Sequence, residues 1–269
     1  MLALIAGGGK LPSQVIAAAQ ELNKPFLIIA FTGQTDPELV AGHPHYWTHL
    51  GAVGDIVTHL HANAVKEIVM AGNIKRPAFS EMRLDGMGVR WLGRIGWRAF
   101  GDDGVLSSIT NLLEEEGFAV VAAAALLGEG LLSPSGVLGA HHPSDADRQD
   151  IARGIEVIKA LGTVDVGQAT VIQQGLVLGV EAIEGTEKLL ERCGTLRRAG
   201  PGGVLVKIAK PGQSHRVDLP TIGVDTITQA SKSQLVGIAL QAGATQIIDR
   251  ENVIALADKL GLFVVGMDV

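Results

Sequence analysis

The sequence predicts an α/β fold. Short uncharged apolar runs alternate with amphipathic segments through the first half of the chain, a pattern typical of a parallel sheet covered by helices on both faces. A stretch rich in Gly, Ser, Pro and His then interrupts the alternation at 131–143. We therefore expect two α/β domains joined by a linker over 131–143: a Rossmann-like N-terminal domain over 1–130 with a mostly parallel sheet, and a C-terminal α/β domain over 144–269.

The N-terminal elements follow from the order of these runs. The first apolar run ends in a glycine-rich turn, and Pro12 suits the first turn of the helix that follows. The same alternation predicts the other elements. The expected strands are Leu2–Ala6, Phe26–Phe31, Glu67–Ala71 and Phe118–Ala124, and the expected helices are 12–22, 55–64 and 105–116.

The C-terminal domain is expected to mix helices with paired strands. Ser144 and Asp147 have capping-box spacing, which predicts a helix from Ser144 to Leu161 rather than a metal site at the neighbouring His141 and His142. A helix is also expected from Ile227 to Ala242. The other expected elements are the paired strands 168–173 and 176–180, the strands 203–209, 246–248 and 262–265, and the helices 186–193 and 253–260.

The composition excludes several classes of protein. Of the 269 residues, 47% are apolar and 19% are charged, which is typical of a globular protein and not of a disordered one. The single cysteine, Cys193, cannot form an internal disulfide and favours a reducing compartment. The net charge of −6 argues against a nucleic-acid-binding face, so we expect no nucleic-acid partner.

No segment has the features of a targeting or membrane-spanning sequence. The first residues lack a basic lead-in and end at a glycine run. The longest uncharged apolar stretch, around 118–127, reaches about 12 residues, whereas a spanning helix needs roughly 20. We therefore expect a soluble or peripheral protein in the cytoplasm.

A glycine-rich loop follows the first strand. In Gly7-Gly8-Gly9-Lys10-Leu11, glycines allow close approach of an anion, and the next helix offers free backbone N–H groups. Pro12 occupies the third glycine position of the dinucleotide fingerprint, and no Ser or Thr follows Lys10 as in a P-loop. The loop is therefore a candidate anion or nucleotide site of no standard type, with a tight turn as the alternative.

A polar segment follows the strand that ends at Ala71. Ligands of open parallel sheets bind at the carboxyl ends of strands, and Asn73, Lys75 and Arg76 lie at such an end. An amide and two cations there suit a phosphate or diphosphate. The alternative is a solvated loop.

Two acids follow the strand that ends at Val180. Glu181 and Glu184 precede Gly185-Thr186, which opens a helix, and this arrangement suits a sugar or nucleotide, bound directly or through a metal. The alternative is that Thr186 simply caps the helix.

The last candidate segment contains two lysines and two acids. Lys207 lies within an apolar strand, which is costly unless it is paired. The two-residue period of a strand places Lys210 on the other face unless the chain turns there. Asp218 and Asp225 flank a proline-containing loop. Cations near phosphates, with acids to hold a metal or steer water, are the components of phosphoryl transfer. For Asp225, the N-cap of the next helix is an alternative role.

These segments, in this order, resemble a known family over nearly the whole chain: the UDP-2,3-diacylglucosamine pyrophosphatases of lipid A biosynthesis, of the type unrelated to metallophosphoesterases. The block at 180–186, Val-Glu-Ala-Ile-Glu-Gly-Thr, is the most specific. The other blocks that support the resemblance are Ala6–Gly9 with Leu11-Pro12, Ala71-Gly72-Asn73, Asp165-Val166-Gly167-Gln168, Val206-Lys207, Lys210-Pro211 and Asp218-Leu219-Pro220.

The resemblance implies Mg²⁺-dependent hydrolysis of UDP-2,3-diacylglucosamine to UMP and 2,3-diacylglucosamine 1-phosphate (lipid X). It also implies a lipid-linked UDP-sugar held by two α/β domains, and a catalytic role for Asp225. Combined with the residue chemistry, it predicts three groups of site residues. The catalytic group is Asp225, Lys207 and Lys210; the metal ligands are Asp225, Glu181 and Asp218; the substrate-binding group is Gly8, Gly9, Lys10, Leu11, Asn73, Lys75, Arg76, Gln168, Glu184, Gly185 and Thr186.

The family pattern has two departures here, Ser214 in place of an acid and Glu187 in place of Asp. The alternative function is a non-catalytic protein that binds a nucleotide-sugar or lipid. The segment from Met82 to Trp97 carries several arginines among apolar residues, so it is either a membrane-surface element or a core helix with exposed arginines. Peripheral contact with the cytoplasmic face of the inner membrane therefore remains open.

Overall fold

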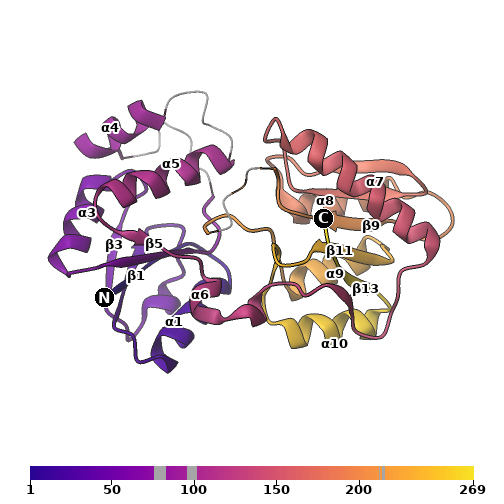
Figure 1. The fold of residues 1–269 in the computed structure, drawn as a ribbon, viewed down its shortest axis with the longest axis horizontal. Helices are drawn as coiled ribbons and strands as arrows, with labels where there is room; N and C mark the ends of the chain where they lie inside the picture. The colour runs from indigo at the N-terminus through magenta and orange to yellow at the C-terminus, as the bar shows by residue number, and fades with distance from the viewer. Residues whose placement is uncertain (76–82, 96–101, 212, 214–215) are drawn as a thin grey trace. The chain divides into compact units, whose positions relative to one another are not determined.

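The computed structural model describes residues 1–75, 83–95, 102–211, 213 and 216–269. The chain divides into two compact units (Figure 1). Unit 1 comprises Met1–Glu129 and Ser214–Asp218, and unit 2 comprises Gly130–Gln213 and Leu219–Val269. Each unit contains a sheet covered by helices, which confirms the predicted pair of α/β domains.

Unit 1 is built on a five-stranded sheet in which every pair of neighbouring strands is parallel. The strand order β3-β2-β1-β4-β5 is that of a Rossmann-like sheet, as predicted. The chain leaves β1 toward β2 on one side and returns to β4 on the other, so the topological switch point lies between β1 and β4. The strands are β1 Leu2–Ala6, β2 Phe26–Phe31, β3 His45–Thr48, β4 Glu67–Ala71 and β5 Ala119–Val120.

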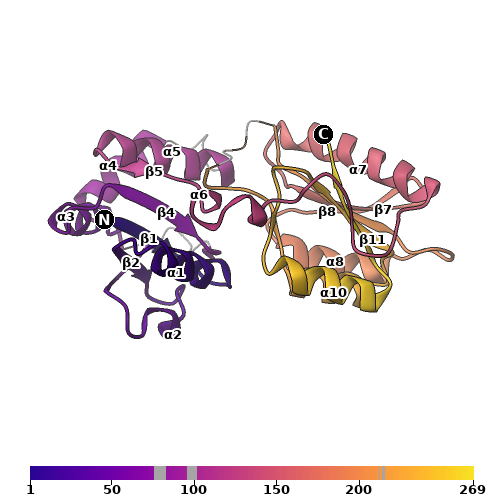
Figure 2. The same cartoon turned by 60° about the horizontal axis from the view of Figure 1, so that its bottom comes forward.

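Helices cover both faces of this sheet (Figure 2). On one face α1 (Leu11–Glu21) packs against β1, β4 and α6 (Ala124–Leu127). The other face is covered by α3 (Val53–Ala62), α4 (Gly86–Ile95) and α5 (Asp102–Glu115), whose apolar side chains form one buried cluster with the strands. A short helix, α2 (Pro37–Val40), follows β2.

Helix α4 answers one question that the sequence left open. Its Trp91 is buried in the cluster that includes Ile29 of β2 and Leu60 of α3, and its Arg94 pairs with Glu115 of α5. Within the described residues of the segment 82–97, the apolar side of the helix therefore packs in the core of unit 1 and its arginines face outward. Met82 and Trp97 lie outside the described residues.

Unit 2 contains a mixed six-stranded sheet in the order β6-β13-β11-β9-β7-β8. The three central strands β13, β11 and β9 are parallel, and β6, β7 and β8 pair antiparallel. The strands are β6 Gly136–Leu138, β7 Ala169–Gln173, β8 Leu176–Val180, β9 Val204–Lys207, β11 Gly237–Gln241 and β13 Phe263–Met267. A separate parallel pair joins β10 (Thr221–Ile222) to β12 (Gln246–Ile247).

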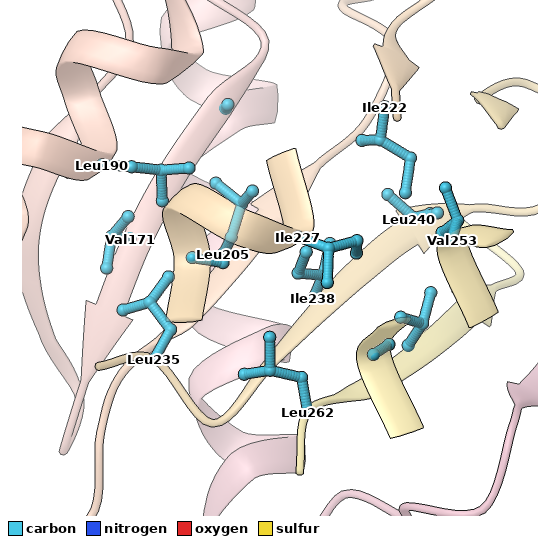
Figure 3. Close-up of a cluster of buried hydrophobic side chains, with 14 of the residues drawn as sticks. Val171, Leu190, Leu205, Ile222, Ile227, Leu235, Ile238, Leu240, Val253 and Leu262 are labelled. Atoms are coloured by element: carbon cyan, nitrogen blue, oxygen red, sulfur yellow. The ribbon is translucent and has the colours of Figure 1, made fainter. Parts of the chain in front are cut away.

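The helices of unit 2 divide between the two faces of its sheet (Figure 2). Helix α7 (Asp145–Gly162) packs on one face, against Val204 and Val206. The opposite face is covered by α8 (Gly185–Thr195), α9 (Val224–Lys232) and α10 (Arg250–Leu260), and Figure 3 shows Leu190, Leu205 and Ile227 in the buried cluster between them. Cys193 belongs to this cluster, where burial raises the pKa of its thiol.

The structure corrects several expectations. The strand expected over Phe118–Ala124 is limited to Ala119–Val120, and Ala124 begins α6. The segment 131–143 is not a linker, because Gly136–Leu138 forms β6 and extends the sheet of unit 2 beside β13. The helix expected over 227–242 ends at Lys232. Gln234 then adopts a left-handed conformation with φ of 56°, and the next apolar residues form the central strand β11. Strand β11 is almost entirely buried, and hydrophobic periodicity alone does not distinguish a fully buried strand from a segment of a buried helix.

The described residues contain no helix that is both long and apolar enough to cross a membrane. The predicted capping box is confirmed: the Ser144 N–H donates to Asp147 Oδ2 at 2.8 Å, and the Asp147 N–H donates to Ser144 Oγ at 3.2 Å.

Candidate functional site

The glycine loop of unit 1 and the segment after β4 are locked together at the topological switch point. The Gly8 N–H donates to the Asn73 carbonyl at 2.8 Å, and the Asn73 N–H donates to the Gly8 carbonyl at 2.9 Å. A Cβ atom at Gly7 would lie 2.6 Å from the Asn73 oxygen, and one at Gly72 would lie 2.5 Å from the Gly8 oxygen. Glycine is required there because the two backbones approach so closely.

The predicted anion-binding residues of unit 1 gather around this contact. Lys10 is the N-cap of α1 and Leu11 its first residue, and in the described part of the chain no side chain caps the helix. The Lys75 N–H donates to Gln34 Oε1 at 2.8 Å, which fixes the segment after Asn73. The exposed Gly9 and Lys10 thus lie at an uncapped helix N-terminus, where an anion is stabilised. Arg76 lies outside the described residues.

In unit 2, Lys207 is joined to Glu181 through Thr186. The Lys207 ammonium donates to Thr186 Oγ1 at 2.6 Å, and the same hydroxyl donates to Glu181 Oε1. The backbone N–H of Gln168 donates to Glu181 Oε2 at 3.3 Å. Lys207 and Glu181 are only 6% and 7% exposed, so this is a buried polar cluster in which both charges have partners.

Lys210 lies beyond the end of β9, beside Gly162 at the end of α7, so the strand period used to predict its face does not extend to it. Leu205, two residues before Lys207, packs in the cluster with α8, whereas Val206 packs in the cluster with α7. The Lys210 ammonium forms an ion pair with Asp165, which follows α7.

A glutamine pair connects the Lys210 segment to the one that carries Gln168. Gln213 Oε1 accepts from the Lys210 N–H at 2.8 Å, and Gln213 Nε2 donates to Gln168 Oε1 at 3.0 Å. Sequence reasoning did not assign a role to Asp165 or Gln213. A signal for Asp165 was present, since a buried lysine needs an acidic partner.

Asp225 lies at a pocket between α8 and α9. The pocket has a volume of about 360 Å³ and is lined by the first turns of both helices together with Leu190, Gln229 and Lys232. Thr186 and Asp225 both contribute to its wall. The Asp225 side chain is exposed and makes no hydrogen bond or ion pair with the described residues.

Asp225 is not the N-cap of α9. Gly223 is the N-cap, and its N–H donates to Thr226 Oγ1 at 3.3 Å. The alternative role for Thr186 is also wrong, because its hydroxyl contacts Glu181 and Lys207 and caps no backbone group of α8. Neither Asp225 nor Thr186 therefore has the helix-capping role that was the alternative prediction for it.

Glu184 and Gly185 begin α8 at the rim of the cluster. Glu184 accepts from Arg192 at 2.7 Å, and this hydrogen bond holds the pKa of the Glu184 carboxylate below its usual range. Arg192 also donates to the carbonyl of Val180. Glu184 is thus held against its own helix and the end of β8, whereas Gly185, with φ of 78°, forms the turn into α8.

The predicted metal ligands do not form a shared cage. Across the residues that the structure describes, no three His, Cys, Asp or Glu side chains are grouped so that they could hold a metal ion. Both oxygens of Glu181 accept hydrogen bonds from the protein. Asp218 belongs to unit 1, where one of its carboxylate oxygens is buried without a partner among the described residues. Of the three, Asp225 has an exposed carboxylate at a pocket and makes no hydrogen bond or ion pair with the residues that the structure describes.

Together these features define a two-domain α/β protein with a glycine-lined candidate anion site in unit 1 and, in unit 2, a polar pocket whose wall includes Thr186, the partner of Lys207. The sequence matches the LpxI N-terminal domain over residues 1–129 and the LpxI C-terminal domain over residues 134–265. It is also 40% identical to the UDP-2,3-diacylglucosamine pyrophosphatase LpxI of Caulobacter vibrioides, over 99% of this chain and 97% of that protein. The chain belongs to the LpxI family.

Solved structures show weaker similarity. UDP-glucose 4-epimerase of Thermus thermophilus, complexed with NAD, is 12% identical with a TM-score of 0.33, covering 100% of this chain and 86% of that one. The enzyme WbmG of Bordetella bronchiseptica, in complex with NAD and UDP, is 13% identical with a TM-score of 0.33, covering 100% and 99%. Neither similarity is strong enough to support an argument about this chain.

Proposed function

We propose that this protein hydrolyses the diphosphate bond of UDP-2,3-diacylglucosamine to UMP and 2,3-diacylglucosamine 1-phosphate, a step of lipid A biosynthesis. The observation that carries the proposal is the pocket of unit 2, where the unpaired Asp225 carboxylate shares a wall with Thr186, whose hydroxyl contacts the buried Lys207 ammonium. The Caulobacter relative, a UDP-2,3-diacylglucosamine pyrophosphatase by name, supports the choice of substrate.

The residues of the pocket suit a diphosphate. Phosphoryl transfer needs neutralisation of charge more than covalent help. The first turns of α8 and α9 line the pocket, and the N-terminal ends of helices attract anions. Lys207 supplies a buried positive charge next to that wall, whereas Lys210 pairs with Asp165 and does not line this pocket. Asp225 is the residue we assign to orienting the attacking water.

We also propose Mg²⁺ as the cofactor. Mg²⁺ is commonly held by one or two carboxylates together with phosphate oxygens and water, so the free carboxylate of Asp225 fits this role beside a bound diphosphate. When bound, the ion neutralises charge on the phosphates. Glu181 does not fit, because its oxygens are occupied by Thr186 and the Gln168 N–H.

Apolar side chains beside the cluster suit the acyl chains. Ile183, between Glu181 and Thr186, is 94% exposed, and Val166 is 41% exposed. Their segments lie side by side, because a Cβ atom at Gly167 would overlap the carbonyl of Glu181. Exposed apolar groups next to a polar site are suited to an amphipathic substrate. Because such a substrate resides at a membrane surface, we propose a cytoplasmic protein with peripheral contact at the inner membrane.

The test is UMP release from UDP-2,3-diacylglucosamine, measured with Mg²⁺ and with EDTA, for the wild type and Asp225→Asn. We expect the wild type to release UMP in the presence of Mg²⁺ and not in EDTA. For Asp225→Asn we expect kcat to fall roughly 100-fold or more, a loss typical of the removal of a catalytic group. The melting temperature is expected to stay the same, because Asp225 is exposed and unpaired among the described residues.

Two outcomes would contradict the proposal. Unchanged turnover in Asp225→Asn would remove Asp225 from the mechanism, and equal turnover in EDTA would remove the metal. Tight substrate binding without turnover at any Mg²⁺ concentration would favour the non-catalytic binding protein.

A further inference from the structure

The three-residue contact of Lys207, Thr186 and Glu181 has a defined direction. An ammonium can only donate, and an ionised carboxylate can only accept. The Thr186 hydroxyl lies between them, 2.6 Å from Lys207 Nζ and in contact with Glu181 Oε1. Its single proton therefore points to Glu181, and one of its lone pairs points to Lys207.

We propose that Thr186 is a positioning residue for Lys207, with Glu181 holding the Thr186 proton so that the hydroxyl presents a lone pair to the ammonium. The consequence for activity assumes the proposed function, since it supposes that Lys207 acts on the diphosphate. The contact itself does not depend on that function.

The burial of Lys207 and Glu181 explains why such a device is needed. A lysine side chain has four rotatable bonds, and its ammonium loses little by moving toward water. Lys207 is nevertheless 6% exposed and is drawn to one acceptor on the wall of the pocket. Glu181 is 7% exposed and supplies the compensating negative charge through the hydroxyl.

The position of Thr186 in its helix is compatible with the same role. It is the second residue of α8, after the N-cap Glu184, so its hydroxyl is not in the position from which a side chain caps the helix. Here no side-chain cap is formed at this end of α8, and the hydroxyl is committed to the two charged groups. The same residue also lines the pocket that contains Asp225.

This assignment limits what Thr186 can do to a ligand. Because its proton is taken by Glu181, the hydroxyl has no proton to donate to a phosphate oxygen. Hydrogen bonds from the pocket to the phosphates must then come from other donors, such as Lys207, Lys232 or backbone N–H groups. Thr186 therefore acts through Lys207, and Glu181 acts through Thr186.

The first experiment compares Thr186→Val with Thr186→Ser. Valine keeps the shape but removes the hydroxyl, whereas serine keeps the hydroxyl. We expect Thr186→Val to lower kcat about 10- to 100-fold with little change in KM, as misplacement of a catalytic group does. Thr186→Ser should recover to within about threefold of the wild type. Thr195→Val, at the exposed far end of α8, is the matched control.

The second experiment repeats Thr186→Val in a Lys207→Met background. If Thr186 acts through Lys207, Thr186→Val should add almost nothing to the loss of kcat that Lys207→Met causes by itself. Independent, multiplicative losses would overturn the proposal. So would an unchanged kcat in a folded Thr186→Val while Lys207→Met is strongly impaired, and this last result would leave the proposed function intact.

A measurement without substrate tests the positioning of Lys207 by Thr186 separately from the proposed hydrolysis. Lys207 in each variant is labelled with acetic anhydride and quantified by mass spectrometry of its peptide. Loss of a hydrogen bond to a charged group should speed labelling about tenfold in Thr186→Val, with Thr186→Ser and Thr195→Val close to wild type. Equal labelling in all four proteins would overturn the positioning role, whether or not the protein releases UMP.

Discussion

At the residue scale, Gly7 and Gly72 at the switch point of unit 1 must be glycine because a side chain at either position would collide with the neighbouring backbone. Gly72 has φ of 92°, and a Cβ atom there would lie 2.5 Å from the Gly8 carbonyl and 2.9 Å from the ring of Pro12. A side chain would push apart the segments that follow β1 and β4, which form the candidate anion site. The glycine run is thus more than a turn, because it allows two loops to meet.

We expect Gly72→Ala to lower the free energy of unfolding of unit 1 by roughly 1–3 kcal/mol, from overpacking and backbone strain. Urea unfolding measures the effect. Gly93→Ala is the control, since Gly93 is an exposed position of α4 with nothing within 4 Å of an added Cβ. Equal stability of Gly72→Ala and Gly93→Ala would contradict the close approach.

Ile183 is the residue that tests the acyl-chain proposal. Because it is 94% exposed, Ile183→Ser should leave stability unchanged, yet lower kcat/KM for the diacylated substrate about tenfold if an acyl chain covers it. Leu176→Ser, 48% exposed at the opposite end of β8, is the control. A loss of equal size toward a UDP-sugar without acyl chains would speak against acyl contact.

At the element scale, the helices differ in how their N-termini are capped. Helix α7 has a complete capping box, whereas α1 and α8 begin without a side-chain cap. Among the described residues, α3, α6 and α10 also begin without a side-chain cap, so a missing cap by itself does not mark a site. An uncapped N-terminus keeps backbone N–H groups available for an anion.

Removal of the α7 cap should affect stability and not activity. Ser144→Ala is expected to cost about 1 kcal/mol of unfolding free energy. Thermal melting of unit 2 measures the loss, and UMP release below the melting temperature should match the wild type. A comparable loss of kcat in this variant would indicate that α7 has a part in the site.

At the scale of the whole molecule, the chain does not divide at a single point. Residues Gly130–Gln213 belong to unit 2, and the next segment of the chain, Ser214–Asp218, belongs to unit 1. In this segment Val217 packs against the core cluster of unit 1, and Arg216 pairs with Glu114. A fragment ending at Glu129 would lack this contribution. The stability of unit 1 therefore depends on a segment more than 80 residues further along the chain.

We expect Val217→Ala to destabilise unit 1 by about 1–2 kcal/mol, through the loss of partly buried apolar groups. Hydrogen exchange should show faster opening in the strands of unit 1 and unchanged protection in unit 2. Val164→Ala, at a 68% exposed position of unit 2, is the control. Faster exchange in unit 2 alone would contradict the assignment of this segment.

The amino-acid sequence by itself determined the parallel sheet of unit 1, the β7–β8 pair and the α7 capping box. Each of these depends on local periodicity or on residues a few positions apart. Tertiary structure decided that 237–241 is a strand and that 136–138 joins the sheet of unit 2, because both depend on pairing with distant strands. It also decided that Lys207 meets Thr186, 21 residues away, and that Lys210 meets Asp165, 45 residues away. A buried charge demands a partner, but only the folded chain determines which residue lies within reach.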